Sequence, residues 1–404
     1  MSILRQLELA RESYFPPAEE IEEESSGRMA HQPVQYDHMY RFYKEIEPSF
    51  WTDNDLNKDL ETERFHYEKA SKPEKRLWRY VQGFFAVSDF VVGDIIGKKL
   101  TNRIKNPDVN IVYQFIGMME NIHMISYSKV IEKAIFDPVE REKVLSSASK
   151  IPSISRKVNW ISKWCGMENT IHDLDRDSIL AIFELVERNN RILEAMYPGQ
   201  DISIYKSENI LKLEEKLLDK IQPLSLLICA LAILEGIFFS ASFCAVFWFG
   251  KRGLFPGSNK ANELIRRDEG KHVENGALIY RTLIKYKIPQ TLFHDMIREA
   301  VEIEADFIND ALPENSSEGL PGMNNKLMLR YIKSQADYVL DLFGYEKIYN
   351  IRQEDTFEFM TKQSITDTFT DFFRGEEVNY KMHGGADESA KDKDVVFDED
   401  LEEI

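Results

Sequence analysis

Two Glu-x-x-His pairs and one isolated glutamate in an apolar run constrain the fold of this chain more than any other feature. The pairs are Glu120/His123 and Glu269/His272, and residues three apart in a helix project from the same face. Glu235 is the only charged residue between Leu224 and Phe249. A buried carboxylate is costly unless its charge is compensated. A metal ion held by these side chains would supply that compensation.

The spacing also predicts an architecture. Two such pairs and two single carboxylates from other helices form the di-metal site of a ferritin-like four-helix bundle. Asp89, in the apolar segment YVQGFFAVSDFVVGDII, supplies the second single carboxylate. Asp94 is the alternative, although it lies nearer the polar end of that segment. We therefore expect an all-α, ferritin-like helical bundle with a di-metal carboxylate site in its core.

Two other patterns have to be separated from this site. A third Glu-x-x-His pair, Glu63/His66, lies among charged residues in ETERFHYEK, which predicts a solvated helix face without catalytic metal. The apolar run around Glu235 is long enough for a membrane helix. Because no basic cluster flanks it asymmetrically, a buried core helix with a functional carboxylate is the better interpretation.

Charge and cysteine content narrow the partners and the compartment. The 404-residue chain has a net charge of −18, which disfavours binding to a phosphate backbone; neither a nucleic acid nor a membrane is expected as a partner. Cys165, Cys229 and Cys244 lack metal-ligand spacing and are interpreted as reduced core residues. With no apolar signal stretch at the N-terminus, a cytoplasmic location is expected.

The organisation along the sequence is uneven. Residues 1–36 include EEIEEESSG and are predicted to be a flexible acidic arm. Residues 37–372 form the helical domain, and residues 373–404 an acidic tail that is disordered alone. Helical apolar spacing at 177–197 and 207–222 predicts an insertion at about 170–220. This insertion is interpreted as a surface feature without a chemical role, with a regulatory role as the alternative.

Six segments occur in an order typical of one family. They are SFWT, FFAVSD, MENIH followed by Tyr127, LEGIFFSASF, KRGLFPG and NELIRRDEGKH. Together they make the chain resemble the small, radical-generating subunit of class I ribonucleotide reductase, of the eukaryotic or eukaryotic-virus type. The match in order and spacing covers most of residues 37–345, and the insertion at about 170–220 is the main departure.

The resemblance assigns roles to the site residues. It implies two iron ions per chain, with manganese as the alternative, held by Asp89, Glu120, His123, Glu235, Glu269 and His272. Tyr127 follows His123 by four residues and would be the tyrosine that is oxidised to a stable radical. Phe239 and Phe243 would line its dry pocket. All three aromatic residues are also compatible with plain core packing.

Other residues would connect this site to a partner. The resemblance implies that Asp268 forms hydrogen bonds with both His123 and Trp51, and that Trp51 opens a transfer path to the surface. Tyr380 matches a tyrosine of the tail that takes part in radical transfer. The anchors that dock the tail into the large subunit would be Phe397, Leu401 and Ile404.

The implied function is the small subunit of ribonucleoside-diphosphate reductase. Such a subunit is a homodimer, acts only with the large subunit, and works in the cytoplasm of a eukaryotic cell or an infected host cell. One alternative is another ferritin-like di-metal oxidase, which would need neither Tyr127, Trp51 nor the tail. The other is a non-catalytic scaffold paralogue, which should have lost metal ligands.

Overall fold

The computed structural model describes residues 19–23, 32–165, 176–200, 202–213, 224–312, 320–352 and 356–361. The chain divides into two units, Met1–Ser364 and Ile365–Ile404, and the second lies outside the described residues. The described residues contain helices and turns but no β-strand. The prediction of an all-α fold is therefore confirmed.

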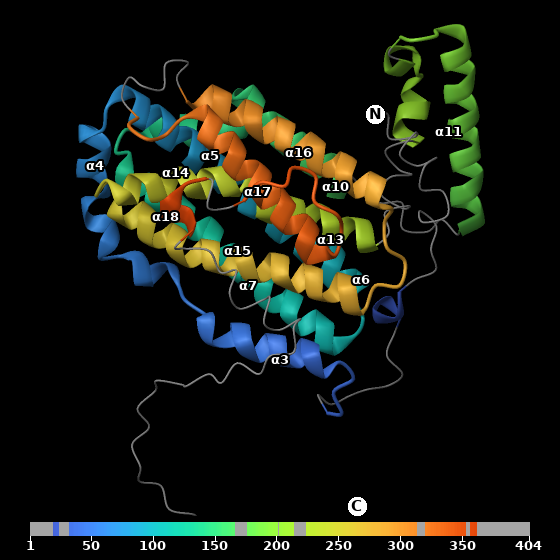
Figure 1. The fold of residues 1–404 in the computed structure, drawn as a ribbon, viewed down its shortest axis with the longest axis horizontal. Coiled ribbons are helices and arrows are strands. Elements are labelled where there is room, and N and C mark those ends of the chain that lie inside the picture. The colour runs from blue at the N-terminus through green and yellow to red at the C-terminus, as the bar shows by residue number, and fades with distance from the viewer. Residues whose placement is uncertain are drawn as a thin grey trace, which may run out of the picture. The chain divides into compact units, whose positions relative to one another are not determined.

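Long helices surround the centre of the bundle (Figure 1). They are α5 (Lys72–Ile95), α7 (Pro107–Ala134), α13 (Leu224–Ile233), α14 (Ser240–Lys251) and α15 (Pro256–Thr282). A π-helical turn, η7 (Leu234–Phe238), joins α13 to α14. Helix α5 packs on α7, α7 on α15, and α15 on α13, η7 and α14. Segments far apart in sequence thus meet in one core.

A second set of helices covers this core. They are α10 (Pro152–Cys165), α16 (Gln290–Ala311) and α17 (Asn325–Phe343); α16 packs on α10 and α17, and both α16 and α17 contact η7. Shorter elements complete the described bundle: η1 (Glu20–Glu22), α3 (Asp37–Ile46), η2 (Glu47–Ser49), η3 (Asp53–Leu56), η4 (Asp59–Thr62), α4 (Glu63–Lys69), η5 (Ile96–Leu100), α6 (Thr101–Arg103), α8 (Pro138–Leu145), α9 (Ser147–Lys150) and α18 (Glu358–Thr361).

Local sequence signals set the ends of the main helices. Ser71 and Glu74 form a reciprocal capping box at the start of α5. The side chains of Asn106 and Asn324 accept main-chain N–H bonds at the starts of α7 and α17. Helix α17 ends at Gly344, whose φ of 82° is the left-handed conformation that favours glycine.

Burial explains the two most apolar helical stretches. Lys72–Arg103 and Leu224–Lys251 are long and apolar enough to cross a membrane by length and composition. Inside the bundle, 94% of the most apolar window of Leu224–Lys251 is buried, and 61% of that of Lys72–Arg103. The stretch that contains Glu235 is thus the core helix that the sequence predicted.

The N-terminal segment differs from the expected flexible arm at two short stretches. Ile21 is fully buried, and the carboxylate of Glu19 accepts the main-chain N–H groups of Lys285 and Tyr286 at 3.0 and 2.9 Å. The N–H of Gln35 donates to a carboxylate oxygen of Asp108 at 2.7 Å. The acidic composition concealed these anchors, because it suggested repulsion where single acids bind main-chain donors.

The predicted insertion contains a helix. Helix α11 spans Arg176–Met196, close to the predicted 177–197, and a turn connects it to η6 (Ile202–Tyr205). The rings of Tyr197 and Tyr205 stack at 3.8 Å across this turn. Of the second predicted helix, residues 208–213 are helical and 214–222 lie outside the described residues.

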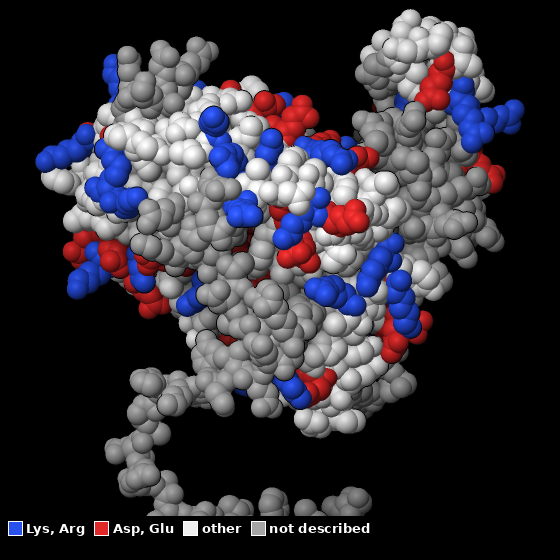
Figure 2. All heavy atoms as spheres, in the orientation of Figure 1, with Lys and Arg blue, Asp and Glu red and all other residues white. Residues whose placement is uncertain are grey.

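Charged side chains of both signs occur among uncharged residues on the face shown in Figure 2. Along the described residues many are paired, as in the ion pairs Lys163–Glu299 and Arg156–Asp306. This face therefore does not present a single-sign field of the kind that attracts a phosphate backbone.

Candidate metal centre

Four helical elements contribute to one buried cluster of carboxylates and imidazoles. Asp89 comes from α5, Glu120 and His123 from α7, Glu235 from η7, and Glu269 and His272 from α15. Donor atoms of Asp89, Glu120 and His123 lie within 4.8 Å of one another, as do those of Glu120, Glu235, Glu269 and His272. Glu120 belongs to both groups. The structure thus brings all six predicted ligands together around two adjoining positions.

Two carboxylates lie between the two imidazoles. His272 Nδ1 is 2.9 Å from Glu120 Oε1 and 3.4 Å from Glu269 Oε2. His123 Nδ1 is 3.1 Å from Glu269 Oε1 and 3.7 Å from Glu120 Oε2. Each of these carboxylates therefore faces one imidazole with each of its oxygens. Such a pair of carboxylates can be shared by two ions.

The cluster is built for a group with positive charge. Several buried donor atoms lack a hydrogen-bond partner among the described residues: both oxygens of Asp89, Glu120 and Glu269, and Nδ1 of His123 and His272. Unpartnered buried polar atoms are rare in proteins. The four carboxylates of the cluster can carry four negative charges, which two divalent cations would balance. The residues present therefore fit a pair of divalent metal ions, and mixed carboxylate and imidazole donors suit iron or manganese.

The ionisation of the cluster shows the strain of its like charges. Burial raises the pKa of Asp89 well above its usual value, and the charges of Glu120 and Glu269 raise it further. Burial likewise raises the pKa of Glu235. Burial also opposes ionisation of Glu120, but hydrogen bonds with His123 and His272 outweigh it and lower its pKa to about 2. Without cations, the carboxylates cannot all be ionised at little cost.

Asp268 fixes the orientation of His123. Its Oδ2 accepts hydrogen bonds from Trp51 Nε1 at 2.7 Å and from His123 Nε2 at 3.1 Å. Because a carboxylate can only accept, Nε2 of His123 carries the proton and Nδ1 presents its lone pair to the cluster. The rings of Trp51 and His123 are stacked, with centroids 5.9 Å apart. Both hydrogen bonds expected of Asp268 are thus present.

Tyr127 lies in a fully buried pocket beside the cluster. Its ring stacks on Phe85 with centroids 4.5 Å apart and an interplanar angle of 9°. Its hydroxyl donates to Asn262 Oδ1 at 2.9 Å. Burial, together with the charges of Asp89 and Glu269, raises the pKa of Tyr127 well above its usual value. The residue is therefore a neutral phenol.

The two predicted pocket residues act through a third aromatic ring. Phe239 and Phe243 have centroids 5.8 and 5.1 Å from that of Phe85, the ring that stacks on Tyr127. Phe84 packs on Phe239 from the other side, at 5.6 Å. The apolar surroundings of the phenol are thus layered, and Phe85 forms the layer next to it.

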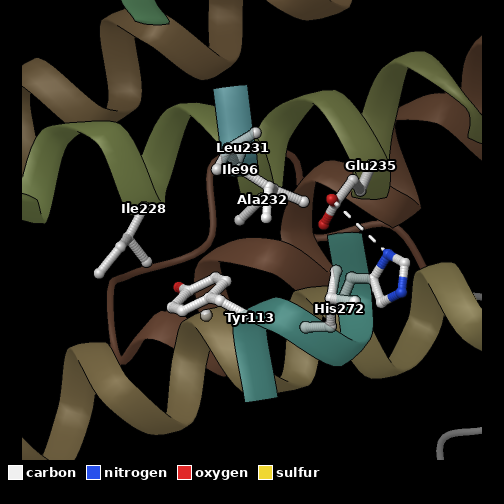
Figure 3. Close-up of a pocket in the computed structure, with 9 residues that line it drawn as sticks. Ile96, Tyr113, Ile228, Leu231, Ala232, Glu235 and His272 are labelled. Atoms are coloured by element: carbon white, nitrogen blue, oxygen red, sulfur yellow. Dashed lines mark ion pairs between the residues drawn. The ribbon is translucent and has the colours of Figure 1, made fainter. Parts of the chain in front are cut away.

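A small cavity lies beside Glu235 and His272. In Figure 3 the Glu235 carboxylate points toward the His272 imidazole, and the ion-pair distance is 3.8 Å. Apart from Tyr113, the remaining wall is apolar: Ile96, Ile116, Ile228, Leu231, Ala232 and Gly276. The volume of about 10 Å³ is near that needed to hold one water-sized molecule. Burial raises the pKa of Tyr113, so this wall carries a neutral hydroxyl.

The Glu63/His66 pair lies outside the metal-binding groups found among the described residues, but Glu63 is not solvated as predicted. It is fully buried, and its carboxylate accepts the Ser258 N–H at 2.8 Å and the Ser258 hydroxyl at 3.0 Å. A Cβ on Gly257 would lie 2.8 Å from Glu63 Oε1. The carboxylate therefore caps the start of α15, which the charged flanks in the sequence concealed.

The remaining predicted residues fall into two groups. Asp94 forms an ion pair with Lys98 at 2.5 Å and is absent from both metal-binding groups, so Asp89 is the ligand that the geometry favours. The predicted tail residues lie outside the described residues: Tyr380, Phe397, Leu401 and Ile404. Their roles stay predictions.

Two contacts of Tyr127 escaped the sequence analysis, although a spacing signal exists for each. Phe85 precedes Asp89 by four residues on α5, and Asn262 precedes Glu269 by seven on α15. Both intervals place side chains on one helix face. Extending each ligand face by one or two turns would have found both residues.

Comparison with known proteins places this geometry in a sequence family. A family described as ribonucleotide reductase, small chain, matches residues 28–356. A ribonucleoside-diphosphate reductase small chain of Trypanosoma brucei brucei is 32% identical over 386 residues, which cover 95% of this chain and 96% of that protein. A relative of the same description from Arabidopsis thaliana is 33% identical, with 83% of this chain and 82% of that protein covered. Human subunit M2 is 30% identical, with 87% and 75% covered.

Solved structures share the fold. The Rnr4 homodimer of Saccharomyces cerevisiae superposes with a TM-score of 0.63 at 24% identity and covers 91% of this chain and 96% of that one. The dimanganese(II) form of NrdF from Streptococcus sanguinis superposes with a TM-score of 0.58 at 13% identity, with 84% and 99% covered. At these identities the likeness concerns the architecture of the helical bundle.

Proposed function

Because the chain belongs to the family of ribonucleotide reductase small chains, we propose that it generates and stores the tyrosyl radical of a ribonucleoside-diphosphate reductase. One observation carries this proposal: a complete set of six ligand side chains lies beside a fully buried tyrosine, Tyr127. The radical equivalent would pass to a separate large subunit, where ribonucleotides are reduced to deoxyribonucleotides.

The cofactor in this proposal is a pair of iron ions, with manganese as the alternative. The ligands would be Asp89, Glu120, His123, Glu235, Glu269 and His272. When bound, the metal pair supplies the oxidising power, drawn from dioxygen, that converts a tyrosine to its radical. The protein supplies ligands, insulation and a path. The apolar cavity beside Glu235 gives a small uncharged molecule a place next to the ligands.

Tyr127 is suited to hold an unpaired electron. A neutral tyrosyl radical survives only where reductants and water are excluded. Tyr127 has no exposed surface, and Phe85 covers one face of its ring. Phe239 and Phe243 contact Phe85 and exclude water from the next layer. These side chains would keep the radical from being quenched.

Trp51 and Asp268 are the proposed start of the transfer path. The hydrogen bonds Trp51–Asp268 and Asp268–His123 form a continuous connection away from the cluster. Trp51 comes from the segment after η2, near the outside of the bundle, and is 6% exposed. Tyr380 would continue the path in the tail, and Phe397, Leu401 and Ile404 would anchor the tail in the large subunit.

A second copy of this protein is the proposed partner at α7. The exposed stripe of this helix is uncharged over four turns: Gln114, Met118, Asn121, Ile125 and Ser128. In a protein that is 30% charged, such a stripe favours an interface between proteins. The homodimer named for the Saccharomyces structure supports a second copy as its occupant.

The two alternatives lose support for separate reasons. A scaffold paralogue should lack ligands, whereas all six are present and face one another. Another di-metal oxidase would need no Trp51–Asp268–His123 connection, which is present here.

The test is an electron paramagnetic resonance spectrum after iron(II) and oxygen are added to the metal-free protein. A tyrosyl signal is expected in the wild type, and Tyr127→Phe should abolish it together with ribonucleotide reduction. Tyr113→Phe is the matched control, because this buried tyrosine lies on the same helix. Iron content should be unchanged in Tyr127→Phe. A full signal in that variant would place the radical on another of the 17 tyrosines.

A further inference from the structure

The hydroxyl of Tyr127 meets a single buried amide. It donates to Asn262 Oδ1 at 2.9 Å, and Asn262 is fully buried on α15. The other end of the amide, Nδ2, donates to the main-chain carbonyl of Ser258 at 2.7 Å. Asn262 therefore joins the phenol to the first turn of the helix that carries Asp268, Glu269 and His272.

The direction of these hydrogen bonds is fixed by the Ser258 carbonyl. A carbonyl oxygen can only accept, so the NH₂ group of Asn262 must face Ser258 and its oxygen must face Tyr127. Ser258 is itself held, because its N–H and hydroxyl both donate to the buried Glu63 carboxylate. Turning the amide over would place two oxygens against each other at Ser258. The phenol consequently has an acceptor beside it and must be the donor.

This arrangement favours one oxidation state of Tyr127. The reduced phenol has a hydrogen to donate to Asn262. The neutral radical has none, so its oxygen would face the amide oxygen without a hydrogen between them. An amide oxygen accepts a hydrogen bond but is not a base at ordinary pH, so the phenol proton cannot move to Asn262. The contact therefore stabilises the reduced, protonated form only.

We infer that Asn262 is a positioning residue that stabilises reduced Tyr127 and thereby makes its radical more strongly oxidising. The inference rests on the proposed function of Tyr127. In the couple, the phenol O–H bond breaks, one electron leaves to the oxidised metal pair, and the proton leaves to a base other than Asn262. In the reverse direction a reductant such as ascorbate supplies the electron and the proton, and the O–H bond forms again.

The first experiment examines the reduced protein without metal. An infrared difference spectrum of ring-labelled tyrosine, wild type minus Tyr127→Phe, isolates the C–O stretch of this phenol. A hydrogen-bond donor is expected in the wild type and a free phenol in Asn262→Leu, which is nearly isosteric and apolar. A free phenol in a radical-forming wild type would overturn the inference and leave the proposed function standing.

The second experiment examines the radical. After exchange into D₂O, electron–nuclear double resonance of the wild type should detect no exchangeable deuteron hydrogen-bonded to the radical oxygen. A deuteron coupling that disappears in Asn262→Leu would mean that the amide turns over and donates, which would refute the inference.

The third readout is radical lifetime in the presence of ascorbate. Asn262→Leu should slow the decay by roughly three- to ten-fold, the factor that corresponds to one neutral hydrogen bond. Asn275→Leu is the matched control, because Asn275 is also fully buried on α15 and its lifetime should equal that of the wild type. Equal lifetimes in all three proteins would contradict the inference. A metal-loaded wild type without any tyrosyl signal would overturn the proposed function and the inference together.

Discussion

Lys157 and Glu304 form an ion pair in the core that no step above requires. Both side chains have no exposed surface, and Lys157 Nζ lies 2.5 Å from Glu304 Oε2. The ammonium also donates to the Phe238 carbonyl at 3.0 Å and lies 3.6 Å from the centre of the Phe84 ring. Phe238 ends the π-helical turn that carries Glu235. We predict that Lys157→Met destabilises the fold through the carboxylate it leaves behind.

The size of the effect follows from the ways in which the variant can respond. Breaking a buried ion pair costs about 3–5 kcal/mol, because an uncompensated charge remains. The folded variant can instead protonate Glu304. At pH 7 this costs about 3.4 kcal/mol relative to an unfolded carboxyl with a pKa of 4.5, at 1.36 kcal/mol per pH unit. Neutralisation therefore limits the electrostatic loss to about 3 kcal/mol at pH 7.

The same argument gives the sign of the pH dependence. Burial raises the pKa of Glu304 and lowers that of Lys157, so burial outweighs pairing at both groups. A carboxyl with a raised folded-state pKa favours the folded protein at low pH, and this stability is lost as the pH rises toward the folded pKa. Removing Lys157 raises that pKa further. The stability gap between wild type and Lys157→Met should therefore narrow between pH 7 and pH 5, by at most about 1.4 kcal/mol per unit.

The assay is urea unfolding of the metal-free protein, followed by far-ultraviolet circular dichroism at one protein concentration. Lys163→Met is the matched control. Lys163 and Glu299 join the same two helices, but their side chains are 24% and 36% exposed, so their loss should cost below about 1 kcal/mol. The double variant Lys157→Met/Glu304→Leu should regain most of the lost stability. The reasoning fails if the double variant stays as unstable as the single one, or if the gap ignores pH.

Three further outcomes are expected. His272→Ala should lower the amount of iron bound per protein molecule, whereas His66→Ala should leave it unchanged, because His66 is absent from the metal-binding groups; metal analysis after desalting decides, and equal losses would contradict the assignment. Ile125→Lys should shift sedimentation toward the monomer, since it places a charge in the uncharged stripe of α7; an unchanged dimer would exclude this face. Removing residues 386–404 should leave iron content and the radical intact but abolish turnover with the large subunit, and full turnover at low concentration would favour a merely solubilising tail.

The ligand set could be found in the sequence because helical periodicity translates directly into geometry. Glu120/His123 and Glu269/His272 are local pairs, and an interval of three residues fixes a shared face whatever the tertiary structure. Glu235 was conspicuous because an apolar run surrounds it. Asp89 required the further premise of a bundle, and the choice against Asp94 rested on its distance from the polar end.

Residues that act across long separations could not be found in this way. Glu63 caps a helix whose first turn lies 195 positions away, and the surrounding charges suggested the opposite environment. Lys157 meets a carbonyl 81 positions away, and nothing in its own segment marks it as buried. The packing of α4 on α15 and of α10 against the helix that contains Glu235 decides both contacts, and periodicity does not encode that packing.

These concealed charges act on the backbone of the ligand helices rather than on the ligands. Glu63 holds the first turn of α15, from which Ser258 and Asn262 extend to Tyr127. Lys157 holds the last carbonyl of the π-helical turn that presents Glu235. A cluster of four buried carboxylates would relax apart if its helices were free to shift, because like charges repel in a medium of low dielectric constant. Fixing the two helix segments from outside therefore keeps the carboxylates close enough to share two cations, without adding further ligands to the site.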